Sequence, residues 1–271
     1  MDAVKLGIKS KQFRHKWLGE LLDDNNLYPF LGRYQVVEDM RSRITNKLGQ
    51  YYYENHKIQE FLYRVDTGGT DDYAFLKMFY VINPDNIKID YNPKDDDPAQ
   101  IPVDLYVLQE VRGNHLSPSN INKVLLSMGA NKKRCNIKFD VNSDAQVQGL
   151  IESGWSCLGK LNSKNEGAKV SKKKYKGYNF KNAMVYYGSE VISNIYIDSS
   201  CKKLIEEMPM FKRLEKDGVI VPQKFDDGND HSVDAFLYGV LDYAEGKITK
   251  NYLSFFNNNS CNLNQIWGYQ R

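Results

Sequence analysis

Several features that define common protein classes are missing from this chain of 271 residues. No apolar run approaches the ~20 residues that cross a bilayer, and the opening residues MDAVKLGIKSKQFRHKW lack the apolar core of a signal peptide. The four cysteines are too widely spaced for a zinc cluster, and there is no GxxxxGK[ST] phosphate loop. We therefore expect a cytoplasmic protein with reduced thiols, no membrane span and no P-loop motor activity of its own.

The composition, with 41% hydrophobic and 26% charged residues, is typical of a folded globular protein. The net charge is only +3, but the positive residues are segregated. A basic segment over residues 162–182 has aromatic residues between its lysines. Its candidate DNA-binding residues are Lys169, Lys172, Lys173, Lys174, Lys176 and Lys181. Such a segment is either a solvated loop or a surface that contacts a nucleic-acid backbone.

The hydrophobic pattern divides the chain into three parts. Residues 1–60 are charged and Tyr-rich, with a predicted helix over 10–22, and we interpret them as an adaptor segment. Residues 61–244 form the predicted main domain, and 245–271 form a polar tail. The predicted strands of the main domain lie over 61–66, 73–82, 104–111, 135–140, 155–158 and 219–222, with one or two more over 183–198. The predicted helices are one that starts at 117–118 and three over 143–153, 202–211 and 230–243.

This order of elements predicts an α/β fold, with a mixed central sheet flanked by helices. The first three strands are expected to form an antiparallel meander. Helical crossovers then add the later strands alongside it.

Four residues form the candidate catalytic and metal site. Asp66 and Asp140 each end a predicted strand, whereas His231 and Asp234 are three residues apart in the first turn of the last helix and share one face. A helix packed on the sheet can bring all four together. Carboxylate oxygens suit Mg²⁺ or Mn²⁺, and the imidazole makes Mn²⁺ more acceptable. Two such ions support in-line hydrolysis of a phosphodiester.

Each acid also has a simpler interpretation. Asp140 can cap the helix that follows it, and Asp230 suits the N-cap of the last helix. Glu110, at the end of the third strand, is either a further ligand or a group that supports the ligands, and Asp72 and Asp230 are candidate supporting groups. The acidic run at 95–97 is better explained as a solvated loop, because consecutive side chains diverge.

The motifs RVDTGGTDDYAF, DLYVLQEV, NIKFDVNSDAQVQGLIESGW and DHSVDAFLYGV resemble, in this order, the C-terminal nuclease domain of large terminase subunits from tailed bacteriophages, especially the headful-packaging type. The resemblance extends from Phe13 to Tyr243 and is most specific in DHSVDAFLYG. One departure is Phe236-Leu237, where many members have Leu-Arg, which weakens any phosphate contact at Leu237.

The resemblance implies an RNase H-like fold of the retroviral-integrase superfamily and a metal-dependent endonuclease that cuts concatemeric viral double-stranded DNA. By position, Asp66, Asp140 and Asp234 match the family's acidic triad, and His231 matches its metal-proximal histidine. The implied partners are double-stranded DNA, the terminase ATPase domain, the small terminase subunit and the portal protein, in the cytoplasm of an infected bacterium. The motor half is missing, so we expect either an excised domain or the product of a split gene.

Two other functions remain open from the sequence. A junction resolvase of the RNase H-like class would prefer branched DNA to linear duplex. A non-catalytic DNA-binding or docking module would use the acids only to shape the fold, and would not respond to metal.

Overall fold

A computed structural model describes residues 27–67, 72–82, 103–140, 142–160, 180–226, 228 and 230–244. The predicted helix over 10–22, the acidic run at 95–97, most of the basic segment and the tail from 245 lie outside the described residues. None of the described helices is long and apolar enough to cross a membrane.

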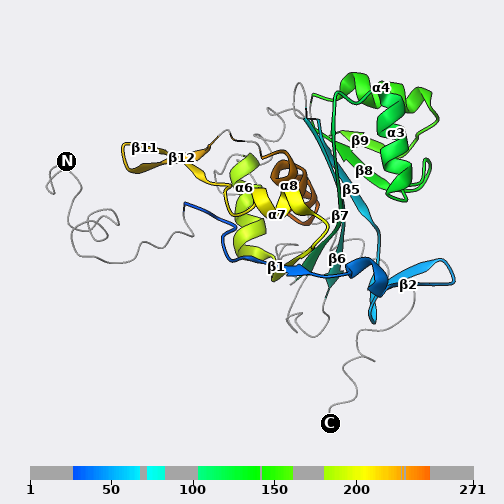
Figure 1. Ribbon diagram of the computed structural model, residues 1–271, viewed down its shortest axis with the longest axis horizontal. Coiled ribbons are helices and arrows are strands. Elements are labelled where there is room, and N and C mark those ends of the chain that lie inside the picture. The colour runs from blue at the N-terminus through cyan, green and yellow to red at the C-terminus, as the bar shows by residue number, and fades with distance from the viewer. Residues whose placement is uncertain are drawn as a thin grey trace, which may run out of the picture.

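The core of the fold is a seven-stranded sheet with the strand order β1-β10-β7-β6-β5-β8-β9 (Figure 1). Its strands are β1 (Tyr34–Val37), β5 (Leu62–Asp66), β6 (Asp72–Ile82), β7 (Val103–Asn114), β8 (Asn136–Phe139), β9 (Leu158–Lys160) and β10 (Asn194–Asp198). Strands β5, β6 and β7 form an antiparallel meander. Strands β8 and β9 extend the sheet in parallel beside β5, and β10 and β1 extend it in parallel beside β7.

This arrangement confirms the predicted α/β fold with a mixed central sheet and an antiparallel meander. Strand β1 comes from the segment interpreted as an adaptor, and it forms the edge strand beside β10.

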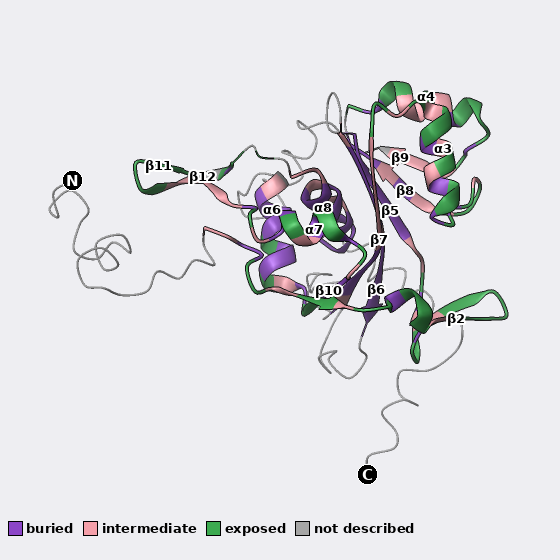
Figure 2. Cartoon of the chain, in the orientation of Figure 1, coloured by how far each residue is buried: buried purple, intermediate pink, exposed green. Residues whose placement is uncertain are grey.

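Helices cover both faces of the sheet, which explains why its central strands are apolar almost throughout (Figures 1 and 2). One face carries α6 (Phe180–Tyr186), a following π-helical turn (Tyr187–Val191), α7 (Lys202–Glu207) and α8 (His231–Ala244). The other face carries α3 (Pro118–Ser127) and α4 (Asp144–Glu152). Along β5, Leu62 belongs to the apolar cluster that contains α8, whereas Tyr63 and Val65 belong to the cluster under α3 and α4.

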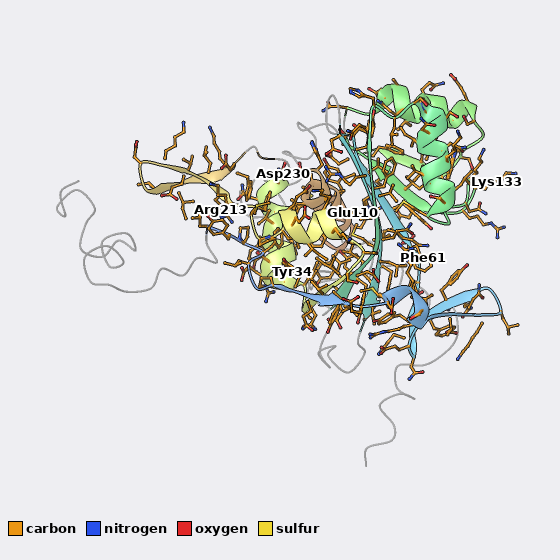
Figure 3. The ribbon with its side chains drawn as sticks, in the orientation of Figure 1. Tyr34, Phe61, Glu110, Lys133, Arg213 and Asp230 are labelled. Atoms are coloured by element: carbon orange, nitrogen blue, oxygen red, sulfur yellow. The ribbon has the colours of Figure 1, made fainter. Side chains whose placement is uncertain are left out.

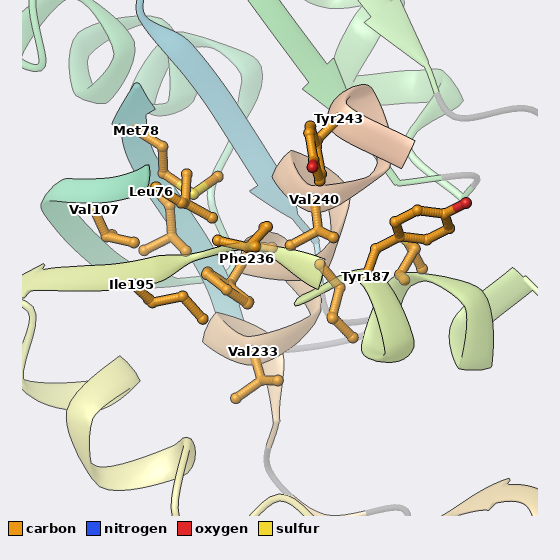
Figure 4. Packing of buried hydrophobic residues seen from close by; sticks show 14 of the residues in the cluster. Leu76, Met78, Val107, Tyr187, Ile195, Val233, Phe236, Val240 and Tyr243 are labelled. Carbon is orange, nitrogen blue, oxygen red and sulfur yellow. The ribbon is translucent and has the colours of Figure 1, made fainter. Parts of the chain in front are cut away.

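The strand predicted at the start of residues 183–198 is wrong, because this part of the chain is helical and only β10 follows as a strand. Ala183, Met184 and Val185 are all buried in the cluster that contains α8. A short apolar run that is buried on all sides has no periodicity that distinguishes a helix from a strand. Figure 4 shows the cluster itself, where Phe236 and Val240 of α8 pack over the sheet.

Two smaller sheets extend from this body. Strands β2 (Ile44–Lys47), β3 (Gln50–Tyr53) and β4 (His56–Ile58) follow a 3₁₀ turn (Met40–Arg43) and form one sheet, here called the N-terminal arm. Strands β11 (Arg213–Lys216) and β12 (Val219–Phe225) form a hairpin. Both project away from the central sheet in Figure 2 and carry many exposed residues.

Candidate active site

Two carboxylates lie at the same edge of the central sheet. Asp66 is the last residue of β5, and Asp140 directly follows β8. These neighbouring strands are parallel, with Val65 opposite Phe139, and the backbone N–H of Asp140 donates to the carbonyl of Val65 at 3.1 Å. Both side chains are largely buried, with 6% exposure for Asp66 and 5% for Asp140. The parallel pairing of β5 and β8 thus places both acids at one end of the sheet.

Helix α8 packs across β5 and β6 and brings further groups to Asp66. Nδ1 of His231 lies 2.9 Å from Oδ2 of Asp66, and the hydroxyl of Tyr238 donates to Oδ1 at 3.0 Å. Both oxygens of Asp66 therefore have a partner on α8. Tyr238 was not among the residues predicted from the sequence, although it lies seven residues after His231 and four after Asp234, on the same face of the helix.

Asp140 is oriented by hydroxyl groups that are close to it in the chain or in the sheet. Oγ1 of Thr67 donates to its Oδ1 at 2.7 Å, and Oγ of Ser143 donates to the same oxygen. The backbone N–H of Asn142 donates to Oδ2 at 3.4 Å. These contacts fix the carboxylate next to the start of α4.

Asp234 has an ion pair with Lys181 at 2.8 Å, and Lys181 also contacts Asp230 at 3.1 Å. Burial raises the pKa of Asp234 to about 7, and the negative charges of Asp230 and Asp66 add to this effect, while Lys181 opposes it. Lys181, a candidate DNA contact from its sequence, is thus placed against the acids of α8. The other candidate lysines, residues 169–176, lie outside the described residues.

The charges of all three acids act on one hydroxyl group. Burial raises the pKa of Tyr238 well above its usual value, and the charges of Asp66, Asp234 and Asp140 raise it further. The contacts place Asp66 and Asp140 at one end of neighbouring strands, and α8 places His231 and Tyr238 on Asp66.

The first turn of α8 is held by a buried carboxylate from α7. Glu207 accepts hydrogen bonds from the backbone N–H groups of Ser232 at 2.8 Å and Val233 at 3.3 Å. Arg112 of β7 donates to Glu207 at 2.6 Å and to Oγ of Ser232 at 2.6 Å. Side chains from β7 and α7 thereby cap the helix that carries His231 and Asp234.

The three candidate supporting groups have different roles. Glu110 accepts from the backbone N–H groups of Lys203 at 2.9 Å and Leu204 at 3.1 Å, so it caps α7, and it also accepts from Oγ of Ser232. Asp72 forms an ion pair with Arg112. Asp230 precedes α8, where its carbonyl accepts from the N–H of Asp234 at 2.8 Å. Glu110 and Asp72 therefore contact the groups that hold α8.

The donor set fits a hard divalent cation by its chemistry, since it consists of three carboxylates and an imidazole. The Lys181 ammonium between Asp234 and Asp230 shows that a positive charge is accommodated here. Within the part of the chain that the structure describes, however, no three His, Cys, Asp or Glu side chains converge closely enough to hold an ion.

No family model matches this chain, and no curated protein sequence matches it. Among solved structures, it is similar to the large terminase nuclease domain of bacteriophage SPP1 with bound Mn, with 16% identity, a TM-score of 0.49, and coverage of 76% of this chain and 94% of that one. It is also similar to the large terminase nuclease of the thermophilic phage G20c with bound magnesium, with 13% identity, a TM-score of 0.44, and coverage of 79% and 95%.

A third similar structure is the large terminase of another thermophilic bacteriophage, with 14% identity and a TM-score of 0.44. That match covers 81% of this chain and 43% of the longer terminase chain. The identities are low and these TM-scores are below 0.5, so the similarity concerns the fold and does not by itself assign a function. What the comparisons establish is that this chain is similar to the nuclease domains of phage large terminases.

Proposed function

We propose that this chain is a divalent-metal-dependent endonuclease that cuts concatemeric viral double-stranded DNA during genome packaging, as the nuclease part of a large terminase. The observation that carries the proposal is geometric: Asp66 and Asp140 lie at the same end of two parallel neighbouring strands, and α8, which carries Asp234, places His231 on Asp66. The motif order of the sequence supports the same function.

A cluster of carboxylates is costly unless cations balance it, because like charges raise each other's pKa and oppose ionisation. Asp66, Asp140 and Asp234, with His231, are the residues that would hold Mg²⁺ or Mn²⁺. When bound, two such ions supply an activated water and stabilise the leaving oxygen of a phosphodiester.

Neighbouring side chains orient the carboxylates that would bind the ions. Tyr238 and His231 fix both oxygens of Asp66, and Thr67 fixes one oxygen of Asp140. Because Nδ1 of His231 is committed to Asp66, Nε2 is the nitrogen that remains to bind an ion or to orient a water. DNA affinity would come from phosphate neutralisation by Lys169, Lys172, Lys173, Lys174 and Lys176, with little sequence preference.

The remaining assignments follow from the same proposal. Residues 1–60 would link the nuclease to the terminase ATPase domain, and residues 245–271 would form a tail. The small terminase subunit and the portal protein would be the further partners, in the cytoplasm of the infected host.

The test is conversion of supercoiled plasmid to nicked and linear DNA in Mn²⁺, Mg²⁺ or EDTA. We expect the parent to cut only with metal, and the isosteric variants Asp66→Asn and Asp234→Asn to lose cutting. Asp226→Asn is the matched control, because Asp226 is exposed and its carboxylate pairs with Lys212 at 3.2 Å, on the surface of the described part of the chain. Cutting in EDTA, or full activity in both active-site variants, would contradict the proposal.

A non-catalytic DNA-binding or docking module is favoured by one observation. Lys181, His231 and Tyr238 already donate to the acids or pair with them, so the cluster can be stable without metal. In that case, calorimetric titration with Mn²⁺ would show no binding to the folded parent. Replacing Asp66 by Ala would then lower stability without affecting any reaction.

A further inference from the structure

A second candidate site lies at the opposite end of β5 from Asp66. It is a cavity of about 770 Å³, bounded by the N-terminal arm, by β6 and β7, and by the loop before β8. Phe61, at its wall, precedes β5, and Figure 3 shows this residue between the N-terminal arm and the part of the molecule that carries α3 and Lys133. The five residue-to-residue steps from Phe61 to Asp66 correspond to about 16 Å of extended chain. The volume is within the ~300–1,000 Å³ range of small-molecule sites.

A half-buried ammonium without a carboxylate partner lies in the wall of this cavity. Lys77 of β6 donates to the carbonyl of Met128 at 2.8 Å and lies 4.3 Å from the ring centre of Phe61. No carboxylate in the described ranges forms an ion pair with it. Burial lowers the pKa of Lys77 to about 8, and the charge of Arg41 contributes. Since charges removed from water are ordinarily paired, an anion bound in this cavity would be stabilised by Lys77.

Two guanidinium groups add to the positive charge. Arg41, which follows β1, and Arg134, which precedes β8, also line the cavity. Both are exposed, and neither side chain makes a hydrogen bond or an ion pair with the residues that the structure describes. Glu60 is the one acid that lines the cavity in the described part of the chain. An arginine fork with free donors is suited to bind a phosphate by two hydrogen bonds.

Aromatic rings lie beside these cations. Tyr51 of β3 is 42% exposed and packs edge to face on Phe61, with ring centres 5.2 Å apart. An exposed ring of this kind can stack on a nucleic-acid base, whatever the base. The cavity thus combines phosphate-binding groups with a stacking surface.

We infer that this cavity binds a nucleotide unit, with its phosphate on Arg41, Arg134 and Lys77 and its base against Tyr51. The unit comes either from a free nucleotide or from one residue of a DNA strand. The inference does not depend on the proposed nuclease function, because no group of the acidic site takes part.

The test uses the full chain in EDTA, so that no cleavage occurs and the acids hold no metal. The probes are 2-aminopurine deoxyriboside monophosphate, whose fluorescence falls on stacking, and a ten-residue single strand with one 2-aminopurine. We expect quenching by the parent. The double variant Arg41→Ala/Arg134→Ala should raise Kd at least tenfold, and Tyr51→Ala should abolish quenching. Arg43→Ala is the matched control, because Arg43 is two residues from Arg41 and does not line the cavity.

The two sources of the nucleotide give different results. If the strand binds at least tenfold more tightly than the mononucleotide, and the double variant removes this advantage, the site belongs to a DNA strand. Equal affinities that the double variant weakens alike assign the site to free nucleotides. Absence of quenching with both probes, or a Kd that changes no more in the double variant than in Arg43→Ala, overturns the inference. Lys77→Met, which keeps the apolar stem, should weaken binding as well.

Discussion

The cap that Glu207 provides for α8 should contribute measurably to the free energy of unfolding. Glu207 is 7% exposed and accepts from two N–H groups of α8 and from Arg112. The variant Glu207→Gln keeps the shape of the side chain but removes its charge and one of its two acceptor oxygens. The guanidinium of Arg112 then retains Asp72 and Ser232 but loses its buried partner.

The expected loss can be estimated from these contacts. The hydrogen bond from Arg112 to the charged carboxylate contributes about 1.5–3 kcal/mol, and the amide oxygen that remains accepts from the N–H groups of α8 more weakly because it carries no charge. Because Asp72 is partly exposed and still pairs with Arg112, the full cost of an unpaired buried charge does not apply. We therefore expect the free energy of unfolding to fall by about 3 kcal/mol.

Urea denaturation in EDTA measures this loss, with Glu206→Gln as the control. Glu206 is the neighbouring residue on α7, is exposed, and among the described residues pairs with Lys203 on the surface, so its replacement should cost less than about 0.5 kcal/mol. At a temperature where Glu207→Gln is folded, Mn²⁺ affinity should also fall, because the first turn of α8 carries His231 and Asp234. A loss no larger than that of the control would refute the capping role.

Three other changes test separate parts of the structure. Tyr238→Phe removes the hydrogen bond to Asp66 and should lower the free energy of unfolding by about 1 kcal/mol in urea denaturation; an unchanged value would mean that this bond contributes nothing. The pKa of Lys77 is lowered from 10.5 to about 8, so the unfolded chain binds more protons than the folded chain between these pH values. The free energy of unfolding of the parent should therefore rise with pH relative to that of Lys77→Met. We expect a rise of about 1 kcal/mol, because solvent screens part of the effect. Parallel unfolding curves at pH 7.5 and 10.5 measure this difference, and a falling difference would contradict the assigned pKa. Gly239→Ala would place a methyl group 2.4 Å from Cε of Met78, and should lower Tm through a cost of about 1–3 kcal/mol; an unchanged Tm in calorimetry would show that this side chain can move freely.

Local signals in the sequence were sufficient for several elements. Ser117 before Pro118 predicts the start of α3, and in the structure its hydroxyl accepts from the N–H of Asn120 at 3.3 Å. The apolar spacing of residues 230–243 predicts α8 within one residue of its observed bounds. The placement of His231 and Asp234 on one helix face follows from the same periodicity. These features depend only on contacts between residues a few positions apart.

Other features were beyond the sequence because they depend on distant contacts. The run before β10 became helical because of its burial against α8, which no local pattern encodes. The cap on α8 joins Glu207 to Arg112, 95 residues away, and nothing in either segment identifies the other. Lys181 belongs to a basic segment whose composition is that of a solvated loop, and yet it forms an ion pair with Asp234.

The sequence by itself determined the meander of β5, β6 and β7, the acids at two strand ends, and the histidine and aspartate on one helix face. Only the tertiary structure decided that β5 and β8 are parallel neighbours, which brings Asp66 and Asp140 to the same edge of the sheet. It also decided which groups neutralise these acids, since His231 and Asp66 are 165 residues apart in the chain. The physical reason is that strand pairing and buried charge compensation are set by the packing of the whole core, whereas caps and periodicity are set within one or two turns of the chain.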